Sequence, residues 1–173
     1  MGDEITHSQF QPADFDLFQE HLGRETRLLG DWFAQGRFSA EVPVCGLEME
    51  AWLIDSGALA APVNREFLAA MNDPLVVPEL AKFNVEVNST PRALQGAALA
   101  EMRAELDATW RRCVETAGAL GAGIVMVGIL PTVRDEELTI ANMSQMSRYR
   151  ALNEQVLRMR QGRPLHLDIH GQE

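Results

Sequence analysis

Two acidic segments with strand-like alternation, followed by one long amphipathic helix, constrain the fold of this chain most strongly. Residues 83–88 read FNVEVN, in which apolar and polar residues alternate with the period of a half-buried strand. Residues 42–55, VPVCGLEMEAWLID, form an earlier strand candidate in which Gly46 marks a bulge or a close approach. Apolar residues then recur every three to four positions over 95–120, which predicts a helix. Because strands and helices do not alternate regularly, this order favours an α+β fold with a largely antiparallel sheet.

The same patterns predict the remaining elements. Asp14 is placed to cap a helix that runs to Gln35 and stops at Gly36, with Phe15, Phe18, Leu22, Leu29 and Trp32 on one face. The near-continuous apolar run at 123–130 predicts a strand that is buried on both faces. Further predicted elements are a short helix at 64–71, a polar loop at 131–145, a basic helix at 146–161 and an alternating strand in PLHLDIHG, residues 164–171.

Composition limits the classes of function. The chain has 173 residues, of which 46% are hydrophobic, and no linker divides it, so we expect one globular domain over 1–173 with a flexible segment at 1–12. A net charge of −10, from 25 acidic and 15 basic residues, argues against binding to nucleic acid or to an anionic membrane. The two cysteines are far apart, and neither a signal peptide nor a bilayer-spanning stretch is recognisable, which predicts a soluble, cytoplasmic protein.

The acidic strands suggest a binding site for a hard cation. Glu48 and Glu50 are two residues apart, so on a strand their carboxylates point to the same face. If FNVEVN is the neighbouring strand, Glu86 joins them, with Glu79 at the rim. Such a set of carboxylate oxygens, without thiolates, suits Mg²⁺ or Mn²⁺. The ordinary alternative is a solvated strand face that binds nothing.

Three ordered blocks resemble one enzyme superfamily. GLEMEAWLID, ELAKFNVEVNSTP and NMSQMSRYRALNEQV are similar to the successive motifs of the glutamate–cysteine ligase and carboxylate–amine ligase superfamily, over about residues 44–160. The resemblance implies a glutamine synthetase-like catalytic fold, with a curved antiparallel sheet and helices packed on one side. It also implies that a γ-carboxylate is phosphorylated by ATP and that an amine then attacks the acyl phosphate.

The resemblance also suggests roles for individual residues. It implies small-molecule substrates, namely an amino acid and ATP, with Mg²⁺ or Mn²⁺ as the metal. Arginines carry a planar fork of donors that is suited to carboxylate or phosphate groups. The implied metal ligands are Glu48, Glu50 and Glu86, with Glu79 as a weaker candidate; Asn88 and Thr90 are implied substrate contacts, and Arg148 and Arg150 implied contacts to anionic groups.

Several alternatives stay open. Enzymes of this superfamily are longer than 173 residues, so we expect the chain to supply part of the catalytic domain and to show no ligase turnover alone. A non-catalytic binding or regulatory module derived from the fold is the second hypothesis, and a phosphotransferase of the related guanidino kinase fold is a third. Neither His166 nor His170 is assigned as a metal ligand, the residues that bind the nucleotide are not identified, and homo-oligomer formation is open.

Overall fold

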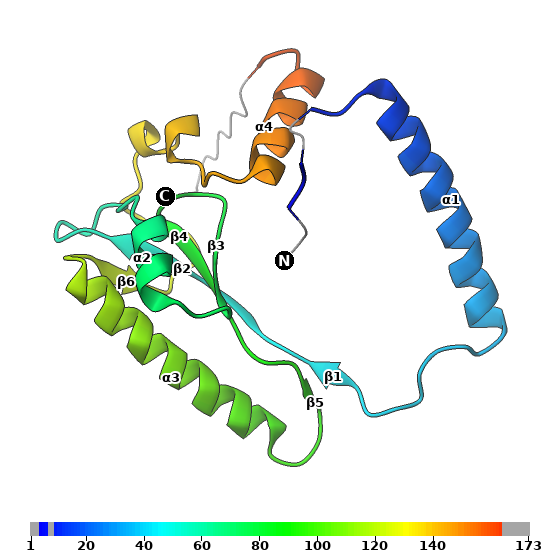
Figure 1. Ribbon diagram of the computed structural model, residues 1–173, viewed down its shortest axis with the longest axis horizontal. Helices are drawn as coiled ribbons and strands as arrows, with labels where there is room; N and C mark the ends of the chain where they lie inside the picture. Colours follow the sequence, from blue (N-terminus) through cyan, green and yellow to red (C-terminus); the bar gives the residue numbers. More distant parts are fainter. Residues whose placement is uncertain (1–3, 7–8, 164–173) are drawn as a thin grey trace, which may run out of the picture. The chain divides into compact units, whose positions relative to one another are not determined.

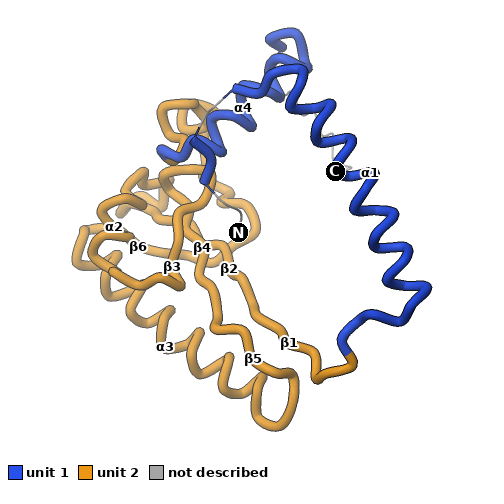
Figure 2. Tube along the Cα trace, turned by 45° about the vertical axis from the view of Figure 1, so that its right-hand side comes forward, with its two compact units in different colours: residues 1–39, 145–173 blue, residues 40–144 orange. Residues whose placement is uncertain are grey.

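The computed structural model describes residues 4–6 and 9–163 and divides into two compact units (Figure 2). We call residues 40–144 the sheet unit, and residues 1–39 together with 145–173 the terminal unit. All the strands in the described residues lie in the sheet unit, and all of them pair antiparallel (Figure 1). Four α-helices and these strands confirm the predicted α+β class.

The main sheet has four strands in the order β3-β4-β2-β6. The two acidic segments form its centre, because β2 pairs with β4 along its length. The condition on which Glu86 joins Glu48 and Glu50, that the two segments are neighbouring strands, is therefore met. The strands of this sheet are β2 (Glu48–Ile54), β3 (Val76–Pro78), β4 (Asn84–Asn88) and β6 (Gly123–Val125); β1 (Val44–Cys45) and β5 (Arg92–Ala93) form a separate two-stranded sheet.

A break at Gly46 separates β1 from β2, where the sequence predicts one long strand. Before the break, Cys45 pairs with Arg92. After it, the Leu47 N–H donates to Ser89 Oγ at 2.8 Å and the Ser89 N–H donates to the Leu47 carbonyl at 2.9 Å. Between these two pairs one chain has a single residue and the other has two, which is the residue count of a β-bulge. The extra residue lies on the partner segment, between Ser89 and Arg92, and Gly46 is the single residue opposite it.

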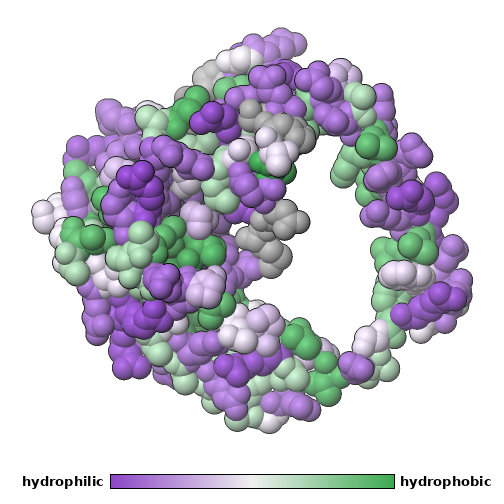
Figure 3. All heavy atoms as spheres, viewed as in Figure 1, coloured by the Kyte–Doolittle hydropathy of each residue, from purple (hydrophilic) through white to green (hydrophobic). Residues whose placement is uncertain are grey.

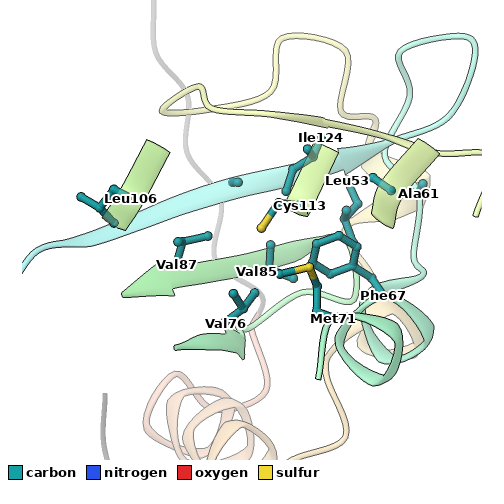
Figure 4. Packing of buried hydrophobic residues seen from close by; sticks show 12 residues of the cluster. Leu53, Ala61, Phe67, Met71, Val76, Val85, Val87, Leu106, Cys113 and Ile124 are labelled. Carbon is teal, nitrogen blue, oxygen red and sulfur yellow. The ribbon is translucent and has the colours of Figure 1, made fainter. Parts of the chain in front are cut away.

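One face of the main sheet is apolar and forms the core with two helices (Figure 4). The helices are α2 (Asn64–Met71) and α3 (Ala98–Ala119). Alternation sends every second side chain of a strand to this face, so β2 contributes Ala51 and Leu53 while its glutamates point away. The buried cluster comprises Ala51, Leu53, Ala61, Phe67, Met71, Val76, Val85, Val87, Leu106, Cys113, Ala117 and Ile124.

The apolar run at 123–130 does not form the long buried strand that its composition predicts. Only Gly123–Val125 pair with β2, and Ile129 is 78% exposed. β6 is an edge strand, and after Val125 the chain leaves the sheet to bring Leu130 into a second small cluster with Phe83. The apolar residues of this run are therefore divided between the main sheet and the second cluster, instead of forming one buried strand.

Asn64 anchors the loops at one end of the sheet. Its Nδ2 donates to the carbonyl oxygens of Ala81 and Asn84 at 3.2 Å and to Ser144 Oγ at 3.0 Å. The side chain is buried, and a buried amide that makes several hydrogen bonds holds its partners in one arrangement. Since Asn84 begins β4, this network fixes the start of an acidic strand.

The terminal unit contains α1 (Pro12–Ala34) and α4 (Ser147–Met159). α1 begins two residues before the predicted cap, because Pro12 starts the helix and Asp14 accepts a hydrogen bond from the Gln11 N–H at 2.7 Å. Its predicted apolar face is exposed, since no residue of α1 is buried (Figure 3). No helix in the described part of the chain is long and apolar enough to cross a bilayer.

Candidate functional site

The face of the main sheet opposite the core carries the predicted acidic residues. In the antiparallel register, Glu48 lies opposite Asn88, and Glu50 lies opposite Glu86. Residues directly opposite one another point to the same face of a sheet. Three carboxylates and one amide, from the two central strands, therefore share one surface. We call these four residues the acidic face.

The pairing brings Glu50 and Glu86 especially close. The Leu47–Ser89 and Leu53–Phe83 hydrogen bonds show that odd-numbered residues of β2 bond to β4. Glu50 and Glu86 therefore form a non-hydrogen-bonded pair, in which the Cα atoms are about 4.5 Å apart and the side chains are closest. Like charges directly opposite each other destabilise a sheet. This pair favours a cation between the two carboxylates.

Glu86 is the most buried of the three carboxylates. Only 5% of it is exposed, whereas Glu48 and Glu50 are exposed. The Asn88 Nδ2 donates a hydrogen bond to Glu86 Oε1 at 2.8 Å. A buried carboxylate that accepts a hydrogen bond from a neighbouring amide is held in a fixed orientation. The acidic face thus combines one fixed carboxylate with two that are free to turn towards a ligand.

The donor chemistry of the acidic face fits a hard divalent cation. Carboxylate and amide oxygens are the ligands that Mg²⁺ and Mn²⁺ prefer. Within the described ranges, 4–6 and 9–163, no group of three or more histidine, cysteine, aspartate or glutamate side chains is already gathered around one point. The backbone register sets these oxygens on one surface, and turning of the exposed Glu48 and Glu50 side chains would be needed to gather them.

Glu79 lies outside the strands that carry the acidic face. It follows the last residue of β3, and its Oε2 accepts a hydrogen bond from the N–H of Leu80 at 2.8 Å. Its backbone carbonyl accepts a hydrogen bond from the Ser144 hydroxyl. The side chain is thus engaged with its own backbone at the end of the strand. Its role as a fourth ligand remains a prediction.

Thr90 is engaged with α3. Its hydroxyl donates to Glu105 Oε1 at 2.6 Å and its N–H donates to Glu105 Oε2 at 3.0 Å. The hydroxyl hydrogen bond is the largest cause of a lowered Glu105 pKa; the Thr90 N–H and Arg92 act in the same direction, and burial opposes them. These contacts tie the end of β4 to α3. They give Thr90 a structural role, and its predicted contact with substrate is untested.

The two predicted arginines lie at the start of α4 in the terminal unit. The Arg148 guanidinium lies over the Tyr149 ring, 4.8 Å from its centroid, and its Nη2 donates to the Tyr149 hydroxyl at 3.1 Å. Arg150 is exposed. Cation–π contact restricts the orientation of the Arg148 guanidinium. Their roles towards anionic groups remain predictions, and His166 and His170 lie outside the described residues.

An aromatic pair borders the acidic face. Trp52 follows Glu50 by two residues and therefore shares its face of the sheet. Its ring stacks on Phe83, with centroids 5.4 Å apart and an interplanar angle of 10°. Asn84, opposite Trp52, shares this face too. The sequence predicted no role for these residues. The period-two pattern that identified Glu50 and Glu86 also places Trp52 and Asn84 on their face, whereas it places Phe83 on the other, so the stacked pair could not be predicted from alternation.

Comparisons with known proteins agree with the motifs. A family profile described as glutamate-cysteine ligase family 2 (GCS2) matches residues 44–167. A protein of Frankia casuarinae that is provisionally named glutamate–cysteine ligase 2-2 is 30% identical over 136 residues. That alignment covers 75% of this chain and 15% of the relative, so the chain spans a small part of the relative's length. No solved structure matches. The matched segment contains β1 to β6 and α4, and the chain belongs to glutamate-cysteine ligase family 2.

Proposed function

We propose that this chain is the N-terminal part of an ATP-dependent glutamate–cysteine ligase of the glutamine synthetase-like fold. The complete enzyme would join glutamate to the amine of cysteine through an acyl phosphate at the γ-carboxylate, in the cytoplasm. The observation that supports this most is the pairing of Glu50 with Glu86 beside Glu48, on the face of the sheet opposite the core, in a chain of this family. Formation of glutathione precursors is the corresponding metabolic role.

The acidic face would bind the metal. Glu48, Glu50 and Glu86 would hold Mg²⁺ or Mn²⁺, and the ion would neutralise charge on the ATP phosphates during phosphoryl transfer. Glu86, which is buried and hydrogen-bonded to Asn88, would fix the position of the site. Because Asn88 lies opposite Glu48, its amide would also be near any substrate carboxylate at this face.

Other residues would contact the substrates. Arg148 and Arg150 would bind anionic groups, either a substrate carboxylate or a phosphate, since a guanidinium forms paired hydrogen bonds with both. Thr90 would act on the substrate only if its hydroxyl were released from Glu105. Glu79 would join the ligands only if its carboxylate turned away from the Leu80 N–H.

Melting of the 173-residue chain with Mg²⁺, with ATP and with both tests this proposal. The metal and nucleotide together are expected to raise the melting temperature more than either alone. At ten times the dissociation constant, binding adds about 1.4 kcal/mol to the free energy of unfolding, which corresponds to a shift of several degrees. The chain alone is expected to release no ADP with glutamate and cysteine.

Variants make the test specific. Glu50→Gln combined with Glu86→Gln is expected to remove the shift, whereas Glu115→Gln, an exposed position on α3, is expected to leave it unchanged. A shift of equal size in all three proteins would contradict the proposal. A chain that is stable and unresponsive to both metal and nucleotide would favour the alternative, a non-catalytic binding or regulatory module.

A further inference from the structure

Two buried polar residues hold the turn between β3 and β4. Asn64 is 4% exposed and Ser144 is 6% exposed. The Asn64 Nδ2 donates a hydrogen bond to Ser144 Oγ at 3.0 Å, and the Ser144 hydroxyl donates in turn to the Glu79 carbonyl. The Ser144 N–H donates to the Leu80 carbonyl at 2.8 Å. We call Asn64 and Ser144 the clasp, because they join this turn to segments that are distant in the sequence.

The clasp holds the pair of residues that follows the paired part of these two strands. Val77 lies opposite Glu86 in the register of β3 and β4. Extended by two residues, the same register places Glu79 opposite Asn84. Each carbonyl of this last pair accepts a hydrogen bond from the clasp, that of Asn84 at 3.2 Å. These hydrogen bonds take the place of the strand ladder, so the Glu79 backbone is fixed although it lies beyond the end of β3.

This position brings the Glu79 side chain within reach of the acidic face. Val77 shares the face of Glu86, and Glu79 follows Val77 by two residues, so its side chain is expected on the same face. Side chains placed diagonally across two strands start about 7–8 Å apart. Two glutamate side chains can close that gap around one ion. The Glu79 Oε2 accepts a hydrogen bond from the Leu80 N–H at 2.8 Å, so the side chain has to turn but the backbone does not have to move.

A fixed backbone lowers the entropic cost of recruiting this carboxylate. The clasp has already ordered the turn, so only the Glu79 rotamer changes on binding. Loss of a partner that holds a metal ligand in place weakens metal affinity by about 10–100-fold. We propose that Asn64 and Ser144 are positioning residues, which hold the Glu79 backbone so that its carboxylate joins the metal at the acidic face. This inference rests on the proposed function, and it concerns side chains that are buried within the sheet unit.

A double-mutant cycle on Mn²⁺ affinity tests the clasp. In the 173-residue chain, Ser144→Ala is expected to weaken Mn²⁺ binding about tenfold or more, and Glu79→Gln by at least as much. In the Glu79→Gln background, Ser144→Ala is expected to have no further effect, because the ligand through which it acts is gone. A purely structural serine would have the same effect in both backgrounds. That result, or no effect in either background, would overturn the proposal.

Thr109→Ala is the matched control. Thr109 carries another buried hydroxyl of the same unit and is 6% exposed, but it lies on α3, outside the clasp. Its replacement is expected to leave Mn²⁺ affinity unchanged. If Ser144→Ala does not fold, Ser144→Cys enters the same cycle, since a thiol keeps the shape of the side chain but is a weaker donor. A loss of Mn²⁺ affinity in Thr109→Ala as large as that in the Ser144 variant would contradict positioning by the clasp.

Amide exchange at Leu80 gives a second readout. Its N–H donates to the Glu79 carboxylate, which has to leave this hydrogen bond to reach an ion. Saturating Mg²⁺ is therefore expected to speed exchange at Leu80. Exchange at Ser144, whose N–H donates to the Leu80 carbonyl, is expected to stay the same because the clasp does not move. Exchange at Leu80 that Mg²⁺ leaves unaltered would contradict the recruitment of Glu79.

The double variant of the acidic face separates this inference from the proposed function. Glu50→Gln combined with Glu86→Gln is expected to lose Mn²⁺ binding whether or not the clasp has a role. If this double variant loses Mn²⁺ while Glu79→Gln and Ser144→Ala bind like the wild type, the acidic face is supported and the inference about the clasp is overturned. If the double variant keeps its Mn²⁺ affinity, the proposed function and the inference fail together.

Discussion

Replacing Phe67 with alanine is expected to lower the free energy of unfolding of the sheet unit by about 3–5 kcal/mol. Phe67 on α2 is fully buried in the cluster that joins both helices to the sheet (Figure 4). The loss combines the transfer free energy of the ring with the cavity left between α2 and the strands. A typical domain is stable by about 5–15 kcal/mol, so this one substitution removes a large fraction of the total. Urea unfolding measures the difference.

An exposed apolar residue of the same unit provides the comparison. Ile129 is 78% exposed, so Ile129→Ala is expected to change the free energy of unfolding by no more than about 0.5 kcal/mol. A loss of several kcal/mol at Ile129, or a negligible loss at Phe67, would contradict the described core. In the first case residues 126–129 would belong to a buried strand after all.

Loss of Mn²⁺ binding is the second large effect. Glu50→Gln combined with Glu86→Gln removes two of the three carboxylates of the acidic face while preserving side-chain size. Changes to groups that only orient metal ligands cost about 10–100-fold in affinity, so losing two direct ligands is expected to exceed about 100-fold. Titration followed by the electron paramagnetic resonance signal of free Mn²⁺ measures this loss.

Single variants separate the roles of the three glutamates. Glu86→Gln is expected to weaken Mn²⁺ binding more than Glu48→Gln, because Glu86 is fixed by burial and by Asn88 whereas Glu48 is exposed. Glu115 lies on α3 and not on the acidic face, so Glu115→Gln is expected to bind Mn²⁺ like the wild type. Unchanged Mn²⁺ affinity in the double variant would show that the acidic face is not the metal site.

Alternation along the strands predicted the acidic face well. A period of two is fixed by strand geometry, so Glu48 and Glu50 had to share a face once their segment was a strand. That β2 pairs with β4 was a condition of the hypothesis, because alternation alone does not specify which strands are neighbours; the structure shows this pairing. The position of Glu79 was less accessible, because it lies beyond the end of β3, where the alternation of a strand no longer applies.

Long-range packing decided the features that the sequence did not predict. β3 is only three residues long and was not recognised. Leu99 fits the apolar period of the long helix, yet it is exposed. The apolar face of α1 was recognised as a pattern, but a pattern does not specify what covers it. In each case the deciding partner is distant in sequence.

The most direct test of the acidic face compares the unfolding of wild type and Glu50→Gln in urea, first without metal and then with saturating Mg²⁺. Without metal, Glu50→Gln is expected to be more stable by about 0.2–1 kcal/mol, since it removes the like charge opposite Glu86. With Mg²⁺ at 100 times its dissociation constant, the wild type is expected to gain about 2.7 kcal/mol and become the more stable protein. A variant that is less stable without metal, or a wild type that gains nothing from Mg²⁺, would contradict a cation site at this face.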